Sequence, residues 1–521
     1  MAVQDGSDGR VGKSGAGWRE REDMIKPLGV VLQPDARFDP GDIYPTVYIP
    51  DRILIDGERD AVEVANALNE TFRTAGWRFS PSRIVTIEPE EGARAEEVAT
   101  ASLLHITGEG AAAGSSPDAW AILRSARREN VDLTGVGLDH LLTVSPIGMN
   151  PFTSTNPFTS TNPFTSTNPF TSTNPFTSTN PFGSTNPASA GLGAYALPGF
   201  GGRQVVNWIG AQPHRDRRRR KERPVVMIID TGCAKHPWFE GGVVQTHVEV
   251  DGKPIGLDDP ATSPDLHPDL VGPLDGEIDP VSGHGTFLAG IVHQLCPDAD
   301  ILAPRIADSL GRVAESDLMA ALEKVAKLVR MHRRNPKTGR RIDVLNLSLG
   351  YYHETPDDVL YSDGLRKVLM KIARCGTTIV CSAGNDATDR PMFPAAFPDE
   401  DGAAPLVSVG AKNPSGKTVA LFSNTADWVD LYAPGVSIVS AFPSFDGGAQ
   451  AITRCDAHGK QRESLDPDDF TGGFAVWSGT SFAAPFAAGR IAAGIDELKA
   501  GAGVAERIAR AHDVIAELGK E

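Results

Sequence analysis

Three short segments of the chain carry side chains that could act together on an acyl group. Asp230 ends the apolar run VVMIID, His284 stands between two glycines in VSGHGTFLAG, and Ser481 lies in WSGTSFAAP. They supply an acid, a base and a nucleophile in the chain order Asp, His, Ser. This is one of the three orders in which such triads are known. The set predicts nucleophilic attack on a carbonyl group.

Such an attack creates an oxyanion, and the sequence offers hydrogen-bond donors for it. Asn385 ends the run TTIVCSAGN and can offer its side-chain amide. Ser481 is followed by FAAPFAAGRIAAGIDEL, whose small and apolar residues indicate a buried helix. We therefore expect Ser481 near a helix N-terminus, where backbone N–H groups lack partners inside the helix. That environment suits a nucleophile whose product carries an oxyanion.

Predicted strands and helices would bring these residues together. From residue 224 onward, short apolar runs alternate with helical stretches; the runs are VVMIID, ILAPRIA, IDVLNLSLG, TTIVCSAGN, LVSVGA and VDLYAPG. Strands that are apolar throughout indicate a parallel sheet covered on both faces. The sequence therefore predicts an α/β fold over 224–521, a parallel β-sheet covered by helices on both faces. Sites in such sheets gather at the carboxyl ends of the strands.

Six segments of this region resemble, in order, the signature segments of the subtilisin-like serine peptidases, or subtilases. They are DTG at Asp230, GHGTFLAG at His284, NLSLG at Ser348, SAGN at Asn385, APG at Pro434 and SGTSFAAP at Ser481. The match covers roughly residues 224 to 500. The resemblance implies a serine endopeptidase in which Ser481 is the nucleophile.

The same resemblance assigns the other roles in the reaction. It implies that His284 is the general base and then the acid for the leaving amine, while Asp230 fixes the tautomer of the imidazole. Asn385 and the backbone N–H of Ser481 would form the oxyanion hole. Ser478 and Thr480 are expected to shape the turn.

The resemblance also implies where a peptide substrate lies. Ser348, Leu349 and Gly350 match the family segment along one side of the cleft, where a peptide pairs like an added strand. Ser382, Ala383 and Gly384 match the floor of the pocket beside the scissile bond. These small residues imply a roomy, mostly apolar pocket that prefers a large apolar or aromatic side chain.

Two departures from the family pattern concern the cleft. Asp386 could alter the preference of the pocket. Phe287 occupies a place where many relatives have a second histidine, and we expect it to bear on the rim of the cleft.

The first part of the chain differs from the rest in composition. Residues 1–41 are rich in Gly, Asp and Arg, which is typical of disorder. Residues 42–148 give strand, helix, strand twice, which allows a small ferredoxin-like α+β domain. Residues 149–223 contain the hexapeptide NPFTST five times, then NPFGST, and continue through Gly-rich and Arg-rich stretches. We interpret 149–223 as an extended, low-complexity linker.

The role of the 42–148 domain has several interpretations. In exported subtilases a small α+β propeptide precedes the catalytic domain, assists its folding and caps the cleft. We hypothesise that the domain regulates access to the cleft and that the 149–223 linker is where the enzyme cuts itself. A folding aid is an alternative, as is a scaffold or recognition module that binds an unidentified protein partner. A catalytically silent relative that only binds peptides is a further alternative.

Composition limits the partners of the chain. Its 50 Lys and Arg residues stand against 67 Asp and Glu residues, and the net charge is −17. This balance argues against general affinity for nucleic acid or an anionic membrane. The resemblance to the subtilases implies that the substrate is a peptide or protein. No secretory signal or membrane span is recognisable, so we expect a cytoplasmic protein, with unconventional export left open.

The sequence calls for no cofactor in the chemistry. Five scattered cysteines without a CxxC pair favour reduced thiols over a disulfide framework or a zinc site. The stretch DGKPIGLDDPATSPDLHPDLVGPLDGEIDP before His284 is rich in carboxylates. We expect an acidic surface loop there, with a structural calcium site as the alternative.

Overall fold

A computed structural model gives the fold of the chain. It describes residues 29–32, 43–83, 100–144, 195, 203–206, 210–216, 222–270, 278–355, 363–445, 453–455, 459–463, 470–499 and 501–520. The predictions of disorder over 1–41 and of a linker over 149–223 fall mostly outside these residues.

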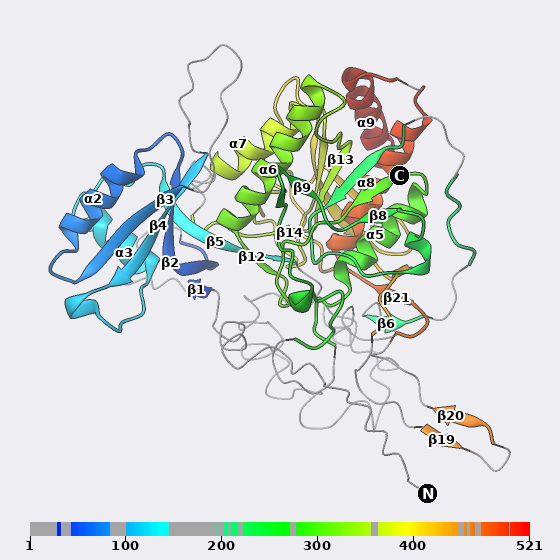
Figure 1. Cartoon of the computed structure of the whole chain (residues 1–521), viewed down its shortest axis with the longest axis horizontal. Helices are drawn as coiled ribbons and strands as arrows, with labels where there is room; N and C mark the ends of the chain where they lie inside the picture. The colour runs from blue at the N-terminus through cyan, green and yellow to red at the C-terminus, as the bar shows by residue number, and fades with distance from the viewer. Residues whose placement is uncertain are drawn as a thin grey trace, which may run out of the picture.

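A parallel sheet of seven strands forms the centre of the C-terminal part, as the sequence predicts (Figure 1). In spatial order the strands are β17 (Leu431–Pro434), β16 (Leu406–Lys412), β15 (Thr378–Ser382), β13 (Val344–Leu347), β7 (Val225–Ile228), β11 (Asp300–Leu302) and β8 (Val244–Gln245). All neighbouring pairs are parallel. The six predicted apolar runs all contribute strands, and only the short edge strand β8 was missed.

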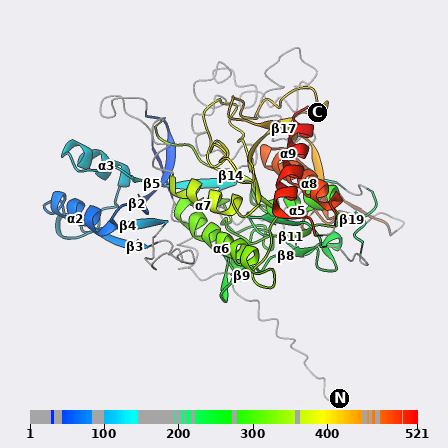
Figure 2. The same ribbon diagram turned by 90° about the horizontal axis from the view of Figure 1, so that it is seen from above.

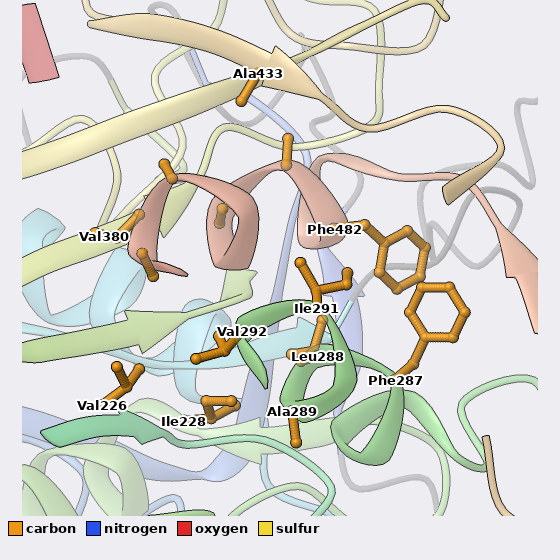
Figure 3. Packing of buried hydrophobic residues seen from close by; sticks show 14 of the residues in the cluster. Val226, Ile228, Phe287, Leu288, Ala289, Ile291, Val292, Val380, Ala433 and Phe482 are labelled. Atoms are coloured by element: carbon orange, nitrogen blue, oxygen red, sulfur yellow. The ribbon is translucent and has the colours of Figure 1, made fainter. Parts of the chain in front are cut away.

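Helices cover both faces of this sheet. Those of one face are α5 (His284–Leu295) and α8 (Thr480–Glu497), with α9 (Val504–Leu518) packed on α8; those of the other are α6 (Glu315–Arg334) and α7 (Asp363–Ala373). Because side chains alternate along a strand, β7 serves both cores. Val226 and Ile228 pack toward α5 (Figure 3), and Met227 packs on the opposite face with α6 and α7.

The N-terminal part forms a smaller antiparallel sheet with two helices. Its elements are β2 (Thr46–Asp56), α2 (Ala61–Thr71), β3 (Trp77–Arg83), β4 (Ala101–Gly108), α3 (Ala119–Arg128) and β5 (Val136–Val144). The strand order β5-β2-β4-β3 is the ferredoxin-like order that the sequence allows. The carboxylates of Asp60 and Asp118 accept backbone N–H bonds at the starts of α2 and α3 and so cap both helices.

Strand β5 joins the two parts of the molecule. Beyond the small sheet, its end lies between two strands of the larger part, β12 (Arg312–Ala314) and β14 (Leu349–Gly350), and pairs antiparallel with both. Val144 is opposite Leu349, and its N–H also donates to the carbonyl of Gly311 at 2.7 Å. Both views show β5 reaching from the small sheet into the larger part (Figures 1 and 2).

Polar contacts surround this junction. Lys367 of α7 lies 3.3 Å from Asp56 and 3.0 Å from Glu58, and Lys371 donates to the hydroxyl of Thr100 at 3.0 Å. The N–H of Tyr44 donates to the carbonyl of Glu354 at 2.6 Å. The two parts therefore share a continuous interface.

The remaining strands are short. They are β1 (Val30–Leu32) beside β2, β6 (Gln204–Val205) with β21 (Phe474–Trp477) and β18 (Ile438–Ala441), β9 (Glu249–Val250) with β10 (Lys253–Pro254), and β19 (Thr453–Cys455) with β20 (Gln461–Glu463). Short 3-10 helices cover Gly110–Ala112, Pro237–Phe239 and Pro260–Thr262. Among the helices described, none is long and apolar enough to cross a membrane.

Candidate active site

Asp230 and His284 lie in direct contact. Asp230 comes just after β7, and its Oδ1 is 2.8 Å from Nδ1 of His284, the first residue of α5. Both side chains are fully buried. The N–H of Thr231 also donates to Oδ1 of Asp230 at 2.8 Å and fixes the carboxylate. A carboxylate acceptor at Nδ1 favours the tautomer with its proton there, which leaves Nε2 as the basic atom.

Glycines allow this approach between strand and helix. Gly283 caps α5 with a φ of 81°, a left-handed conformation that glycine adopts at low cost. A Cβ on Gly285 would lie 2.1 Å from the carbonyl oxygen of Gly232, the glycine that follows Asp230 and Thr231. Only glycine lets the start of α5 come this close to the turn after β7.

Ser481 lies at the start of α8, in a segment whose aromatic residues contact the His284 imidazole. It is the second residue of the helix and is buried. The ring of His284 lies 5.3 Å from that of Phe482 and 5.6 Å from that of Trp477, so it packs on the segment that carries the serine. Within the described residues, Nε2 of His284 makes no hydrogen bond. The bond between nucleophile and base is often long without substrate and tightens when substrate binds.

The Asn385 side chain is hydrogen-bonded to the start of the same helix. Its Oδ1 accepts the N–H of Thr480 at 2.8 Å and the Thr480 hydroxyl at 2.9 Å. Because Thr480 holds the amide oxygen, Nδ2 is the atom that the side chain offers as a donor. The Thr480 hydroxyl also accepts the N–H of Gly384 at 3.1 Å. Thr480 thus shapes the turn, as predicted, and positions Asn385 beside Ser481.

The predicted substrate segments lie around Ser481. The hydroxyl of Ser348 donates to the carbonyl of Ser481 at 2.9 Å, and the Ser348 carbonyl is 3.5 Å from Oγ of Ser481. Leu349 and Gly350 form β14. Ser382 ends β15, Ala383 donates its N–H to Val409, and Gly384 has a φ of 103°. Both segments are buried beside the start of α8.

The prediction that Phe287 bears on the rim of the cleft was wrong. Its side chain is fully buried and lies beside Phe482 (Figure 3). Its ring centre is 4.7 Å from that of Phe482 and 5.8 Å from that of Trp477. It therefore belongs to the core behind the imidazole, where an apolar ring can pack and a histidine would need polar partners.

Asp265 is a residue of the site that the sequence did not reveal. It lies in the stretch expected to be an acidic surface loop, yet it is only 1% exposed. Its Oδ1 accepts the Thr231 hydroxyl at 2.5 Å, and its Oδ2 accepts the Thr286 N–H at 2.8 Å and the Thr286 hydroxyl. Burial raises the pKa of Asp265, whereas the hydrogen bonds from Thr231 and Thr286 lower it. The Asp265 carboxylate therefore connects Thr231, next to Asp230, with Thr286, near His284.

The other described carboxylates of this stretch serve the local structure. Asp258 lies 3.0 Å from Nδ1 of His247, Asp259 accepts the N–H of Ala261 at 3.0 Å, and Asp279 accepts that of Leu270 at 2.7 Å. Calcium takes six to eight oxygen ligands. Within 251–270 and 278–280, the carboxylates do not gather in this way.

Comparisons with known proteins show the family of this chain. A model of the subtilase family matches residues 221–508, more than half of the chain. The chain belongs to the subtilase family.

Individual relatives match this subtilase over part of their length. Subtilisin-like protease 5 of Arthroderma gypseum is 32% identical over 212 residues, which cover 40% of this chain and 42% of that protein. An intracellular serine protease of Paenibacillus polymyxa is 24% identical over 282 residues, which cover 51% of this chain and 65% of that protein. The chain thus spans less than two thirds of these curated relatives.

A solved structure also resembles it. The crystal structure of a cold adapted subtilisin-like serine proteinase aligns with 22% identity and a TM-score of 0.36, covering 55% of this chain and 79% of that one.

We predict that Asp265→Asn lowers the free energy of unfolding by about 1–3 kcal/mol, because an amide cannot accept all the donors that face the buried carboxylate. The measurement is chemical denaturation of chains that also carry Ser481→Ala, which removes the predicted nucleophile. Asp258→Asn is the control, since its exposed pair with His247 contributes little. Equal, small losses for both variants would contradict the role of Asp265.

Proposed function

We propose that this subtilase is a serine endopeptidase that hydrolyses peptide bonds. The observation that carries the proposal is the buried 2.8 Å contact between Asp230 and His284, next to the helix start with Ser481. Oγ of Ser481 adds to the scissile carbonyl carbon while Nε2 of His284 takes its proton. Asp230 stabilises the resulting imidazolium.

The oxyanion and the leaving group complete the cycle. Nδ2 of Asn385 and the N–H of Ser481 bind the carbonyl oxygen once it becomes negative. The tetrahedral intermediate then collapses, and the amine leaves with the proton from His284. Water hydrolyses the acyl-enzyme by the same route, with His284 as the base. No metal or cofactor enters these steps.

The proposed substrate is an extended segment of a peptide or protein. It would pair with β12 and β14, as β5 does in the structure. The relative from P. polymyxa is named an intracellular serine protease. We propose the inside of the cell as the place where this enzyme acts as well.

We further propose that the N-terminal domain closes the cleft. Thr143 of β5 is opposite Gly350, and Val144 is opposite Leu349, the residues assigned to substrate binding. A bound β5 and a bound substrate would therefore use the same backbone groups. The shared pairing favours a regulatory role for the domain over a partner-binding role, because its last strand, β5, already pairs with the peptidase part.

A buried histidine supports this closed arrangement. His140 of β5 places Nδ1 2.9 Å from Glu315 of α6 and Nε2 2.7 Å from Glu354. Burial alone would lower the pKa of His140, but the two carboxylates overcome this effect and raise it to about 10. Burial likewise opposes ionisation of Glu354, but His140 lowers its pKa to about 2. An imidazolium between two carboxylates thus joins the domain to the peptidase.

The same cluster has metal-ligand spacing. Ligand atoms of His140, His353 and Glu354 lie within 4.8 Å of one another. A protonated imidazole donates from both nitrogens and has no lone pair for a metal. We therefore assign the cluster to an ion pair. Other polar groups near it include the Tyr351 hydroxyl, which donates to Glu315 at 3.0 Å, and Asp139, whose pKa burial raises to about 7. The Arg390 guanidinium also lies near it and donates to the His353 carbonyl.

Labelling with a fluorophosphonate tests the nucleophile. We predict one modified residue, Ser481, because only a serine activated by a base reacts readily. Peptide mass spectrometry on intact and self-processed chains locates the label, which Ser481→Ala should abolish and Ser415→Ala should retain. A label elsewhere, or none in either form, would contradict the mechanism.

Replacement of Asn385 tests the oxyanion hole. We predict that Asn385→Ala lowers kcat by about 10²–10³ and leaves KM nearly constant, because the donor acts mainly in the transition state. Steady-state kinetics on a peptide substrate measure both, with Asn66→Ala on the exposed face of α2 as the control. Turnover within about threefold of the parent would show that Asn385 does not bind the oxyanion.

Replacement of His140 tests closure by the N-terminal domain. Because its pKa is about 10 in the closed form and near 6.5 when released, the ion pair holds below about pH 6.5 and weakens as pH rises through about 10. We predict that parent activity rises between about pH 8 and pH 10. His140→Gln should already be more active at pH 7, because it leaves two buried carboxylates without a cation.

The matched control is His105→Gln, on β4 beside Ser82. It should retain the parent pH profile. A His140→Gln chain with the activity and pH profile of the parent would contradict closure.

Cleavage within 149–223 in the parent, but not in Ser481→Ala, would support self-processing of the linker.

A further inference from the structure

We propose that Met392 fills the space beside the scissile bond, so that this subtilase accepts only small side chains there. The residue whose carbonyl is attacked is called the acyl residue below. The proposal rests on the proposed peptidase function. It replaces the roomy pocket expected from the sequence with one selective for Gly, Ala or Ser.

The end of the Met392 side chain lies between Gly350, which was assigned to one side of the cleft, and Gly384, which was assigned to the floor of the pocket. A Cβ on Gly350 would lie 2.6 Å from Cε of Met392, and one on Gly384 would lie 2.7 Å from its Sδ. The thioether therefore reaches both backbones. Met392 is only 4% exposed, yet within the described residues it belongs to none of the four apolar core clusters.

The backbone around Met392 is fixed next to β14. Tyr351, which follows Gly350, exchanges two backbone hydrogen bonds of 2.9 Å with Phe393. The carbonyl of Met392 accepts the N–H of Ala396 at 2.8 Å. Withdrawal of the thioether thus requires a change of side-chain rotamer or of this local backbone pairing.

Other side chains close the same space. Nδ2 of Asn424 would lie 2.5 Å from a Cβ on Gly384, and it donates to the Ala383 carbonyl and the Tyr352 hydroxyl, each at 2.8 Å. The Tyr352 hydroxyl donates to Asp386 at 2.5 Å. The Asp386 carboxylate is therefore engaged within the protein, which argues against selection of a basic acyl residue.

The register of β5 places the acyl residue at this space. Since Thr143 is opposite Gly350 and Val144 is opposite Leu349, the next residue of a strand in this register is opposite Ser348. The Ser348 carbonyl lies 3.5 Å from Oγ of Ser481. A substrate in the β5 register therefore presents that residue to the nucleophile, with Gly350 and Gly384 on either side of its side chain.

A peptide series based on β5 tests the proposal. The substrates are Leu-Thr-Val-Xaa with a fluorogenic leaving group, where Xaa is Gly, Ala, Leu or Phe. The full-length chain carries Val144→Pro, which removes the N–H bond to Gly311 and opens the cleft. We expect kcat/KM for Ala to exceed that for Phe by at least about tenfold, the scale on which apolar pockets discriminate by size.

Shortening Met392 should reverse this preference. Met392→Ala, with Met392→Val as a second variant, should raise kcat/KM for Phe relative to Ala by about 10–100-fold. Met370→Ala is the control; this methionine belongs to α7 and is buried in the core, and its loss should not change the ratio. A parent that cleaves Phe as well as Ala would overturn the proposal, as would unchanged ratios in both Met392 variants.

Failure of the peptidase function is distinguishable from failure of the pocket. If no peptide is cleaved, the proposed function fails. The affinities of the same peptides for Ser481→Ala chains, with and without Met392→Ala, then give the size preference directly. Equal affinity for the Ala and Phe peptides in the presence of Met392 would overturn the inference.

Discussion

Parallel strands end at one edge of their sheet, and the rest of this molecule depends on that constraint. Asp230 follows β7 and Asn385 follows β15, while His284 and Ser481 lie at the starts of α5 and α8, which cover one face of the sheet. Residues far apart in sequence therefore come together, because the segments that carry them lie at the same edge of the sheet. The glycines beside His284 then allow the start of α5 to approach the turn after β7, since a Cβ on Gly285 would clash with that turn.

Patterns local in the sequence predicted most of the fold and the four proposed catalytic positions. Features that depend on distant partners were not predictable. Asp265 is one of several acids in its stretch, and only the folded turn shows which one meets Thr231. Met392 lies in an irregular segment, so no periodicity indicates that it reaches Gly350. Phe287 was misplaced because the resemblance gives a position along the helix but not the packing around it.

The interface between the two parts combines apolar packing, which acts at every pH, with an ion pair that depends on the charge of His140. Apolar residues of β5, Leu142 and Val144, join the core that covers the α6 and α7 face of the sheet. In the proposed closed form, their burial stabilises the interface at every pH. His140 contributes only while it is charged, because its buried carboxylate partners need a cation. Protonation can therefore modulate closure without disturbing Asp230 or His284, which lie on other elements.

In the proposed function, β5 and a substrate compete for the same backbone hydrogen bonds, and these bonds do not distinguish one sequence from another. Two other properties must then separate inhibitor from substrate. Covalent attachment gives β5 a high effective concentration, so weak pairing is enough to keep the cleft closed. Side-chain selection is left to the space beside Ser481, where Met392 limits the size of the acyl residue. Backbone pairing thus supplies general affinity, the domain interface determines when the cleft is open, and one methionine determines which extended segments are cleaved.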